Sequence, residues 1–331
     1  MKFGFLRMVG CGFVAFCACL SPSAQGGQFT IIEGPDARRG SVLSHVSSAL
    51  SASDAALEAH GYTSPNIKVF LSGDANWLTE SYLAAMGLSD RYRAGKLDTF
   101  GRCDPLGEFG KAAIFLCEEH EVWERRRGAT RIVAHEVWHA AVQDGIVQKP
   151  CCFDSNAMSL YGPEWLVEGS AEVFAEYVLA GRNPSRFARA MESFTREAPR
   201  DVDLAKLKSR RGFRNNNGWR VGPAAVYELI NGTNFEKLFD YYEHIANGVS
   251  IDMAFSSAFG QDQASFAAYF ATGNTSRSGC AGWQVGHGDR RLGDVAENAL
   301  GDRSRWPEIA ELNGITAENP HRLGQCLKLP G

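Results

Sequence analysis

The sequence predicts an α+β fold, with a small mixed sheet near the N-terminus packed on a mostly helical half and a small βααβ unit at the C-terminus. Two observations predict it. Segments with the apolar runs of strands come first, and segments with helical periodicity follow. A stretch rich in Gly, Ser and Thr then lacks apolar periodicity and indicates a linker. We expect a leader at 1–26, a large domain at 27–272, a linker at 273–286 and a small domain at 287–331.

The large domain begins with strands and helices in alternation. FTIIEG and NIKVFLS predict strands, with a helix at 41–60 between them. Asp74 is a good N-cap for a helix that runs to Met86. Residues 90–110 are rich in turn formers, and KAAIFLC predicts a third strand after them. The pattern is then helical, in segments that begin at 129 and continue near 163–180, 185–197, 222–247 and 261–271.

The first residues have the pattern of a cleaved export signal. Lys2 and Arg7 give a basic start, the apolar run 8–20 follows, and small residues come after it. The run is shorter than the ~20 apolar residues of a membrane-spanning helix. A retained anchor, or a lipid on Cys17 or Cys19, is the alternative. We expect an exported protein, periplasmic or secreted, without a stable membrane anchor.

The overall charge excludes one class of partner. A formal net charge of −4 gives no basic footprint for nucleic acid, so we expect none. The hydrophobic content of 44% is that of an ordinary globular protein, with enough residues for a large core.

The cysteines predict disulfides. Nine are present, and the three in the leader leave an even number in an exported chain. Sequence alone does not choose among the pairings. We expect Cys280 to pair with Cys326, since both lie in the C-terminal part. Cys103 and Cys117 would then pair with the adjacent Cys151 and Cys152.

The segment ATRIVAHEVWHAAVQDG carries the strongest chemical signal. His135 and His139 are four residues apart in a helical pattern, which places both imidazoles on one face, where they can share one ion. Glu136 lies beside them, where its carboxylate can act as the general base on a metal-bound water. Neutral imidazole suits zinc, and a catalytic zinc has three protein ligands. A surface helix with exposed histidines is the alternative, but this helix is apolar on most sides.

A third ligand is offered by GPEWLVEGSAEVFAEY. Pro163 suits a helix start and Gly181 its end. Glutamates recur there at every fourth residue, and no Lys or Arg between them relieves their repulsion. A bound cation with histidine partners would relieve it; a solvated acidic stripe is the alternative. The four glutamates are Glu164, Glu168, Glu172 and Glu176.

The pairing of HEVWH with EWLVEGSAE resembles the gluzincin metallopeptidases, the clan of thermolysin and the aminopeptidase-N-like enzymes. In these enzymes the glutamate of a Trp-Leu-x-Glu-Gly segment is the third zinc ligand, which implies Glu168 here. The resemblance also implies that Glu172, one turn on, hydrogen-bonds a zinc histidine. Where the clan often has a transition-state tyrosine, this chain has Trp219. Tyr227 is our first substitute for it, although core packing is the alternative role. Two further substitutes are Tyr161 and Arg220.

The C-terminal unit resembles a LysM domain in RSRWPEIAELNGI, NPHRLG-Q and LKLP. LysM domains bind polymers of N-acetylglucosamine, such as peptidoglycan or chitin, in a shallow groove between loops. The resemblance implies groove residues Gly288, Asp289, Leu292, Gly314 and Ile315. A packing domain without glycan binding is the alternative.

Together these features predict an exported zinc metallopeptidase held near cell-wall glycan. Its expected cofactor is Zn²⁺, and its substrate is a polypeptide or a wall peptide. The competing hypothesis is a cell-wall-binding protein whose metallopeptidase-like domain is catalytically inactive.

Overall fold

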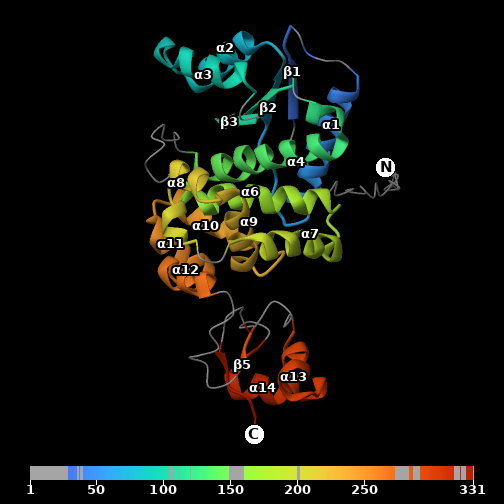
Figure 1. The fold of residues 1–331 in the computed structure, drawn as a ribbon, viewed down its shortest axis with the longest axis vertical. Helices are drawn as coiled ribbons and strands as arrows, with labels where there is room; N and C mark the ends of the chain where they lie inside the picture. The colour runs from blue at the N-terminus through green and yellow to red at the C-terminus, as the bar shows by residue number, and fades with distance from the viewer. Residues whose placement is uncertain are drawn as a thin grey trace, which may run out of the picture.

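The computed structural model describes residues 29–35, 37, 40–103, 107–110, 112–119, 121–148, 160–199, 202–272, 283–285, 291–316, 321 and 326–330. Within them the fold is α+β, as predicted, with strands near the start and helices in most of the rest (Figure 1). Several predictions lie outside the described residues: the leader 1–26, Cys151, Cys152, Cys280, Gly288 and Asp289. None of the described helices combines the length and apolar character needed to cross a membrane.

A four-stranded sheet is formed by β1 (Phe29–Glu33), β2 (Ile67–Ser72), β3 (Gly107–Gly110) and β4 (Ala113–Cys117). The order is β1-β2-β4-β3; the first three in that order are parallel, and β3 is an antiparallel edge strand. The register places Ile31 beside Val69 and Val69 beside Ile114. Side chains alternate across the sheet, so Val69 faces the main core while Phe70 and Phe115 stack on the other face.

Three helices pack on the sheet: α1 (Ser41–Glu58), α2 (Ala75–Met86) and α3 (Arg93–Gly101). α1 shares the main core with Val69, whereas α2 and α3 belong to the cluster on the opposite face. The predicted cap of α2 is confirmed, because the Asp74 side chain accepts from the backbone N–H groups of Asn76 and Trp77. α3 lies in the segment predicted as turns. That prediction was wrong, because the buried Phe100 anchors a short helix against this cluster.

The helical half contains α4 (Arg126–Val137), a π-helical segment η3 (Trp138–Asp144), α5 (Gly145–Val147), α6 (Glu164–Leu179), α7 (Pro184–Glu197), η4 (Leu204–Leu207), α8 (Arg210–Asn215), α9 (Gly218–Leu229), α10 (Glu236–Ala246), α11 (Ile251–Phe259) and α12 (Gln263–Thr272). The helix predicted at 222–247 is two helices. Asn231 and Gly232 have φ of 50° and 88°, and this left-handed turn ends the first helix and redirects the chain.

The C-terminal unit contains β5 (Trp283–Gln284), α13 (Leu292–Leu300), α14 (Trp306–Asn313) and β6 (Cys326–Leu327). β5 pairs antiparallel with β6, so the described elements follow the expected βααβ order. β5 lies inside the segment predicted as a linker. The unit has a small core of its own, to which Val285, Val295, Ile309 and Leu327 contribute.

The disulfide prediction was wrong for Cys103 and Cys117. These two cysteines are bonded to each other, with Cα atoms 5.5 Å apart. The end of α3 brings Cys103 beside the end of β4, and this separation is within the ordinary range for a disulfide. The bond therefore ties α3 to the sheet.

Candidate metal centre

One continuous helical segment carries the histidine motif. His135 and Glu136 lie in the last turn of α4, and His139 lies in the π-helical segment η3 that follows. Single π-turns inside α-helices occur frequently at functional sites. His135, Glu136 and His139 are 8%, 7% and 1% exposed, which excludes the surface-helix alternative.

α6 brings Glu168 to the histidines. The two helical segments are held together at Trp138, whose indole N–H donates to Ser170 Oγ over 2.8 Å. On its other side α6 approaches α9 closely. A Cβ at Gly169 would lie 2.6 Å from the carbonyl oxygen of Gly222, so only glycine fits after Glu168. The Glu168–Gly169 pair therefore places a candidate ligand next to a position where α6 and α9 pack tightly.

Three atoms converge at the centre. His135 Nε2 lies 3.0 Å from His139 Nε2 and 3.2 Å from Glu168 Oε2, and His139 Nε2 lies 3.5 Å from the same oxygen. Ligand atoms about 2.05 Å from a tetrahedral zinc would be about 3.3 Å apart. The spacing of these buried atoms therefore fits a metal of this kind, and these residues form a candidate metal-binding group.

His139 has a buried partner on its far side. Its Nδ1 lies 2.6 Å from Gln143 Oε1, an acceptor, which assigns the ring proton to Nδ1 and leaves a lone pair on Nε2 toward the centre. The amide of Gln143 in turn donates toward the Val167 carbonyl and the Tyr242 hydroxyl, at 2.9 and 2.8 Å. Sequence analysis did not single out Gln143. Its position one turn after His139 on the same segment could have pointed to it.

His135 has a carboxylate on its far side, where the gluzincin resemblance implied one. Its Nδ1 lies 3.2 Å from Glu172 Oε1, in ion-pair range but without good hydrogen-bond alignment. Arg131, one turn earlier on α4, holds the other oxygen of Glu172 at 2.6 Å. Burial would raise the pKa of Glu172, but His135 and Arg131 lower it to about 2. Arg131 was missed in the sequence because its partner lies 41 residues away.

The centre favours added positive charge. Burial lowers the pKa of His135, but its contacts with Glu168 and Glu172 and the charges of Glu172 and Glu136 raise it to about 10. Burial would raise the pKa of Glu168, yet the two histidines hold it well below the usual value. In the protein without metal, a proton on His135 would supply this charge. A divalent cation bound to the same three side chains would supply it instead.

Glu164, at the start of α6, is a fourth acidic group at the centre. It is 5% exposed. Burial and the charge of Glu168 raise the pKa of Glu164 to about 7, although Arg210 opposes this. Arg210 itself lies 3.8 Å from Glu168 through Nη1. The centre therefore holds a carboxyl group that titrates near neutrality.

The candidates for the transition-state residue lie in different places. Tyr227 packs edge-on against Phe187, with ring centroids 5.5 Å apart. The Tyr161 hydroxyl donates to Asp144 Oδ1 over 3.0 Å, and Arg220 pairs with Glu197. The ring of Trp219 lies beside the motif, with its centroid 6.1 Å from that of His135. Its side chain is 44% exposed.

The structure describes three of the expected glycan-groove residues. Leu292 is 9% exposed and belongs to the core of the C-terminal unit, so it offers little surface to a ligand. Gly314 ends α14 in a left-handed conformation, and Ile315 packs against the same core.

Comparison with known proteins finds no family model that matches the chain, no curated protein similar to it in sequence and no solved structure similar to it in fold. The gluzincin and LysM resemblances therefore rest on the motifs alone.

Proposed function

We propose that this protein is an exported zinc metallopeptidase. The observation that carries the proposal is the convergence of two imidazole nitrogens and one carboxylate oxygen, mutually 3.0–3.5 Å apart, from two packed helical segments. Each histidine also faces a polar partner on its far side, as metal-bound histidines commonly do.

His135, His139 and Glu168 would hold the zinc, with Glu172 and Gln143 orienting the rings. When bound, zinc supplies Lewis acidity that polarises a peptide carbonyl and acidifies a water. Glu136 accepts the proton of the attacking water on its carboxylate and delivers it to the leaving amine nitrogen. Burial at 7% exposure keeps this carboxylate out of bulk solvent, where it would exchange its proton with water.

The C-terminal unit is proposed to hold the enzyme near a polymer of N-acetylglucosamine. This part of the proposal rests on the LysM-like motifs and on the βααβ order of the described elements. It makes peptidoglycan the expected partner and places the enzyme in the periplasm or outside the cell. The predicted leader carries the proposal of export.

The test is release of amino groups from peptidoglycan sacculi and, in parallel, from an unfolded protein. Glu136→Gln should retain zinc and lose at least a hundredfold in turnover, because a positioned base contributes about 10²- to 10⁴-fold. Glu192→Gln, an exposed site on α7, is the matched control and should retain full activity.

The substrate profile then decides the biological class. Cleavage of sacculi alone indicates a wall-peptide hydrolase, and cleavage of unfolded protein alone indicates a general peptidase tethered to the wall. Cleavage of neither substrate by a zinc-loaded protein would favour the inactive, wall-binding alternative.

A further inference from the structure

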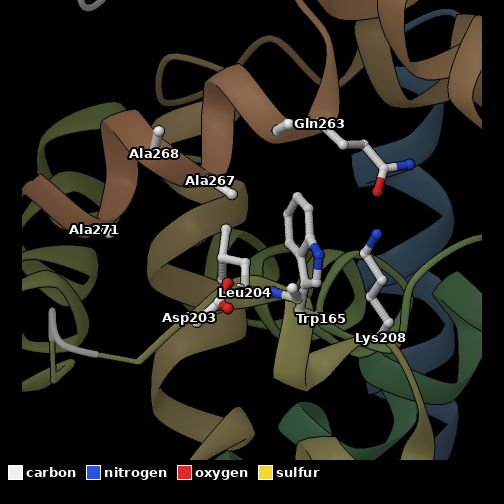
Figure 2. A pocket seen from close by; sticks show the side chains of 10 residues that line it. Trp165, Asp203, Leu204, Lys208, Gln263, Ala267, Ala268 and Ala271 are labelled. Carbon is white, nitrogen blue, oxygen red and sulfur yellow. Dashed lines mark hydrogen bonds between the residues drawn. The ribbon is translucent and has the colours of Figure 1, made fainter.

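A pocket with a volume of about 400 Å³ lies between η4 and α12 (Figure 2). The candidate metal ligands do not line it. Its walls are mostly apolar, with Trp165 and Leu204 on one side and small side chains of α12 on the other. The small side chains are Ala264, Ala267, Ala268 and Ala271. Their spacing of three or four residues puts them on one helix face, where they leave open space.

Trp165 presents a hydrogen-bond donor to this pocket, which its side chain lines. The residue is 1% exposed, and its ring stacks on Phe266 with centroids 5.7 Å apart. The described residues offer no acceptor to its indole N–H, and the nitrogen is not one of the fully buried polar atoms without a partner, so it is open to the pocket. Figure 2 shows its indole nitrogen on the side of the ring that faces Lys208. A ligand oxygen would satisfy this donor.

The charged groups are separated across the pocket. Figure 2 shows Lys208 and the Gln263 amide on the side of the Trp165 ring that carries the indole nitrogen, and Asp203 on the other side. One oxygen of Asp203 is already used, because Oδ1 accepts from the backbone N–H of Ala205 over 2.8 Å as the cap of η4. The end formed by Lys208 and Trp165 therefore offers donors and positive charge, next to an apolar wall.

We propose that this pocket binds an aliphatic carboxylate. Lys208 and the indole N–H of Trp165 hold the carboxylate, and the aliphatic part lies against the alanines of α12. A charge-assisted hydrogen bond of this kind is stronger than a neutral one. Two sources have this chemistry, the C-terminal residue of a peptide and a free short-chain fatty acid.

Residues 208 to 210 connect the pocket lining to the candidate metal centre. The backbone carbonyl of Lys208 accepts from the N–H of Glu164 over 3.0 Å, and Arg210, two residues on, approaches Glu168. The binding proposal does not rest on the proposed peptidase activity, because none of its contacts needs a metal. Binding is expected with and without zinc, so failure of one proposal leaves the other standing.

Calorimetric titration of the mature chain tests the proposal, with N-acetyl-leucine, hexanoate and N-acetyl-leucinamide as probes. We expect an acid to bind and the amide to bind at least tenfold more weakly, because it lacks the charge that Lys208 recognises. Binding of N-acetyl-leucine alone identifies a peptide end, binding of hexanoate alone a free acid, and binding of both the shared chemistry. Binding of neither acid, or equal binding of the amide, would overturn the proposal.

Variants locate the site. Lys208→Met should weaken binding at least tenfold, while Lys206→Met, on η4 but outside the pocket lining, should not change it. Ala267→Leu should abolish binding by filling the space, and Trp165→Phe should weaken it about fivefold while keeping a stacked ring. Circular dichroism verifies that each variant is folded. Unchanged binding in both Lys208→Met and Ala267→Leu would contradict the assignment.

Discussion

The helical half, which carries the candidate metal centre, and the C-terminal unit differ in how strongly their structures point to a function. In the first, buried polar groups meet one another: His139 faces Gln143, His135 faces Glu172, and Glu168 lies within 3.5 Å of both histidines. In the second, a small apolar core supports the elements, and the described candidate groove residues mostly contribute to that core. Burying polar groups costs free energy unless they are paired, so a buried polar cluster points to a function more strongly than a surface motif does.

The largest effect is expected at the ligands themselves. His139→Ala should reduce bound zinc to background, since two side chains cannot replace a three-ligand site. His244→Ala, on α10, should retain one zinc per chain. Metal content after dialysis gives the answer. Full retention of zinc by His139→Ala would show that His139 is not a ligand. The buried polar cluster would then not be the zinc site.

The next effect concerns the partner of His139. Gln143→Ala should weaken zinc binding about 10- to 100-fold, the usual cost of losing an outer hydrogen-bond partner. It should also destabilise the metal-free protein by about 1–3 kcal/mol, because the Val167 carbonyl and the Tyr242 hydroxyl lose their buried donor. Competition with a chromophoric chelator measures the affinity, and urea unfolding measures the stability.

A pH effect is expected at Glu164 in the metal-free protein. Its pKa is about 7 in the folded state, above the ordinary value of 4.5, so the folded state binds this proton more tightly than the unfolded state does. Its ionisation therefore removes stability as the pH rises from about 4.5 to 7, and the loss is complete above that window. Glu164→Gln should be more stable than the unmodified chain at pH 8 by about 2 kcal/mol, with a smaller difference at pH 4.5. Urea unfolding at the two pH values measures this. A difference that does not grow with pH would contradict the assignment.

The smallest effect is expected in the C-terminal unit. The Asn313 side chain donates to the Lys328 carbonyl and accepts from the Lys328 N–H, each over 2.8 Å, and so ties α14 to the end of β6. Asn313→Ala should destabilise this unit by about 1–2 kcal/mol and leave zinc content and peptidase turnover unchanged. Limited proteolysis of the unit, alongside activity, would show whether the two regions are independent.

The elements that depend on neighbouring residues in the chain were predicted from the sequence. The helix carrying the histidine motif, the Asp74 cap and the strands at 29–34 and 66–72 follow from periodicity and capping preferences. Long-range geometry was harder to predict. The Cys103–Cys117 bond depends on α3, which was predicted as turns, and Arg131 acts on Glu172 across 41 residues. The chain breaks between α9 and α10 at a left-handed turn. The apolar pattern continues through this turn, and so it predicted one helix.

Zinc K-edge absorption of the purified mature chain, with the metal content measured on the same sample, tests whether His135, His139 and Glu168 bind zinc. We expect one zinc per chain with nitrogen and oxygen ligands at about 2.0–2.2 Å, an imidazole signature and no sulfur. We also expect loss of that signal in His135→Ala. A chain that does not retain zinc, or a zinc bound through sulfur and unaffected by His135→Ala, would contradict this assignment.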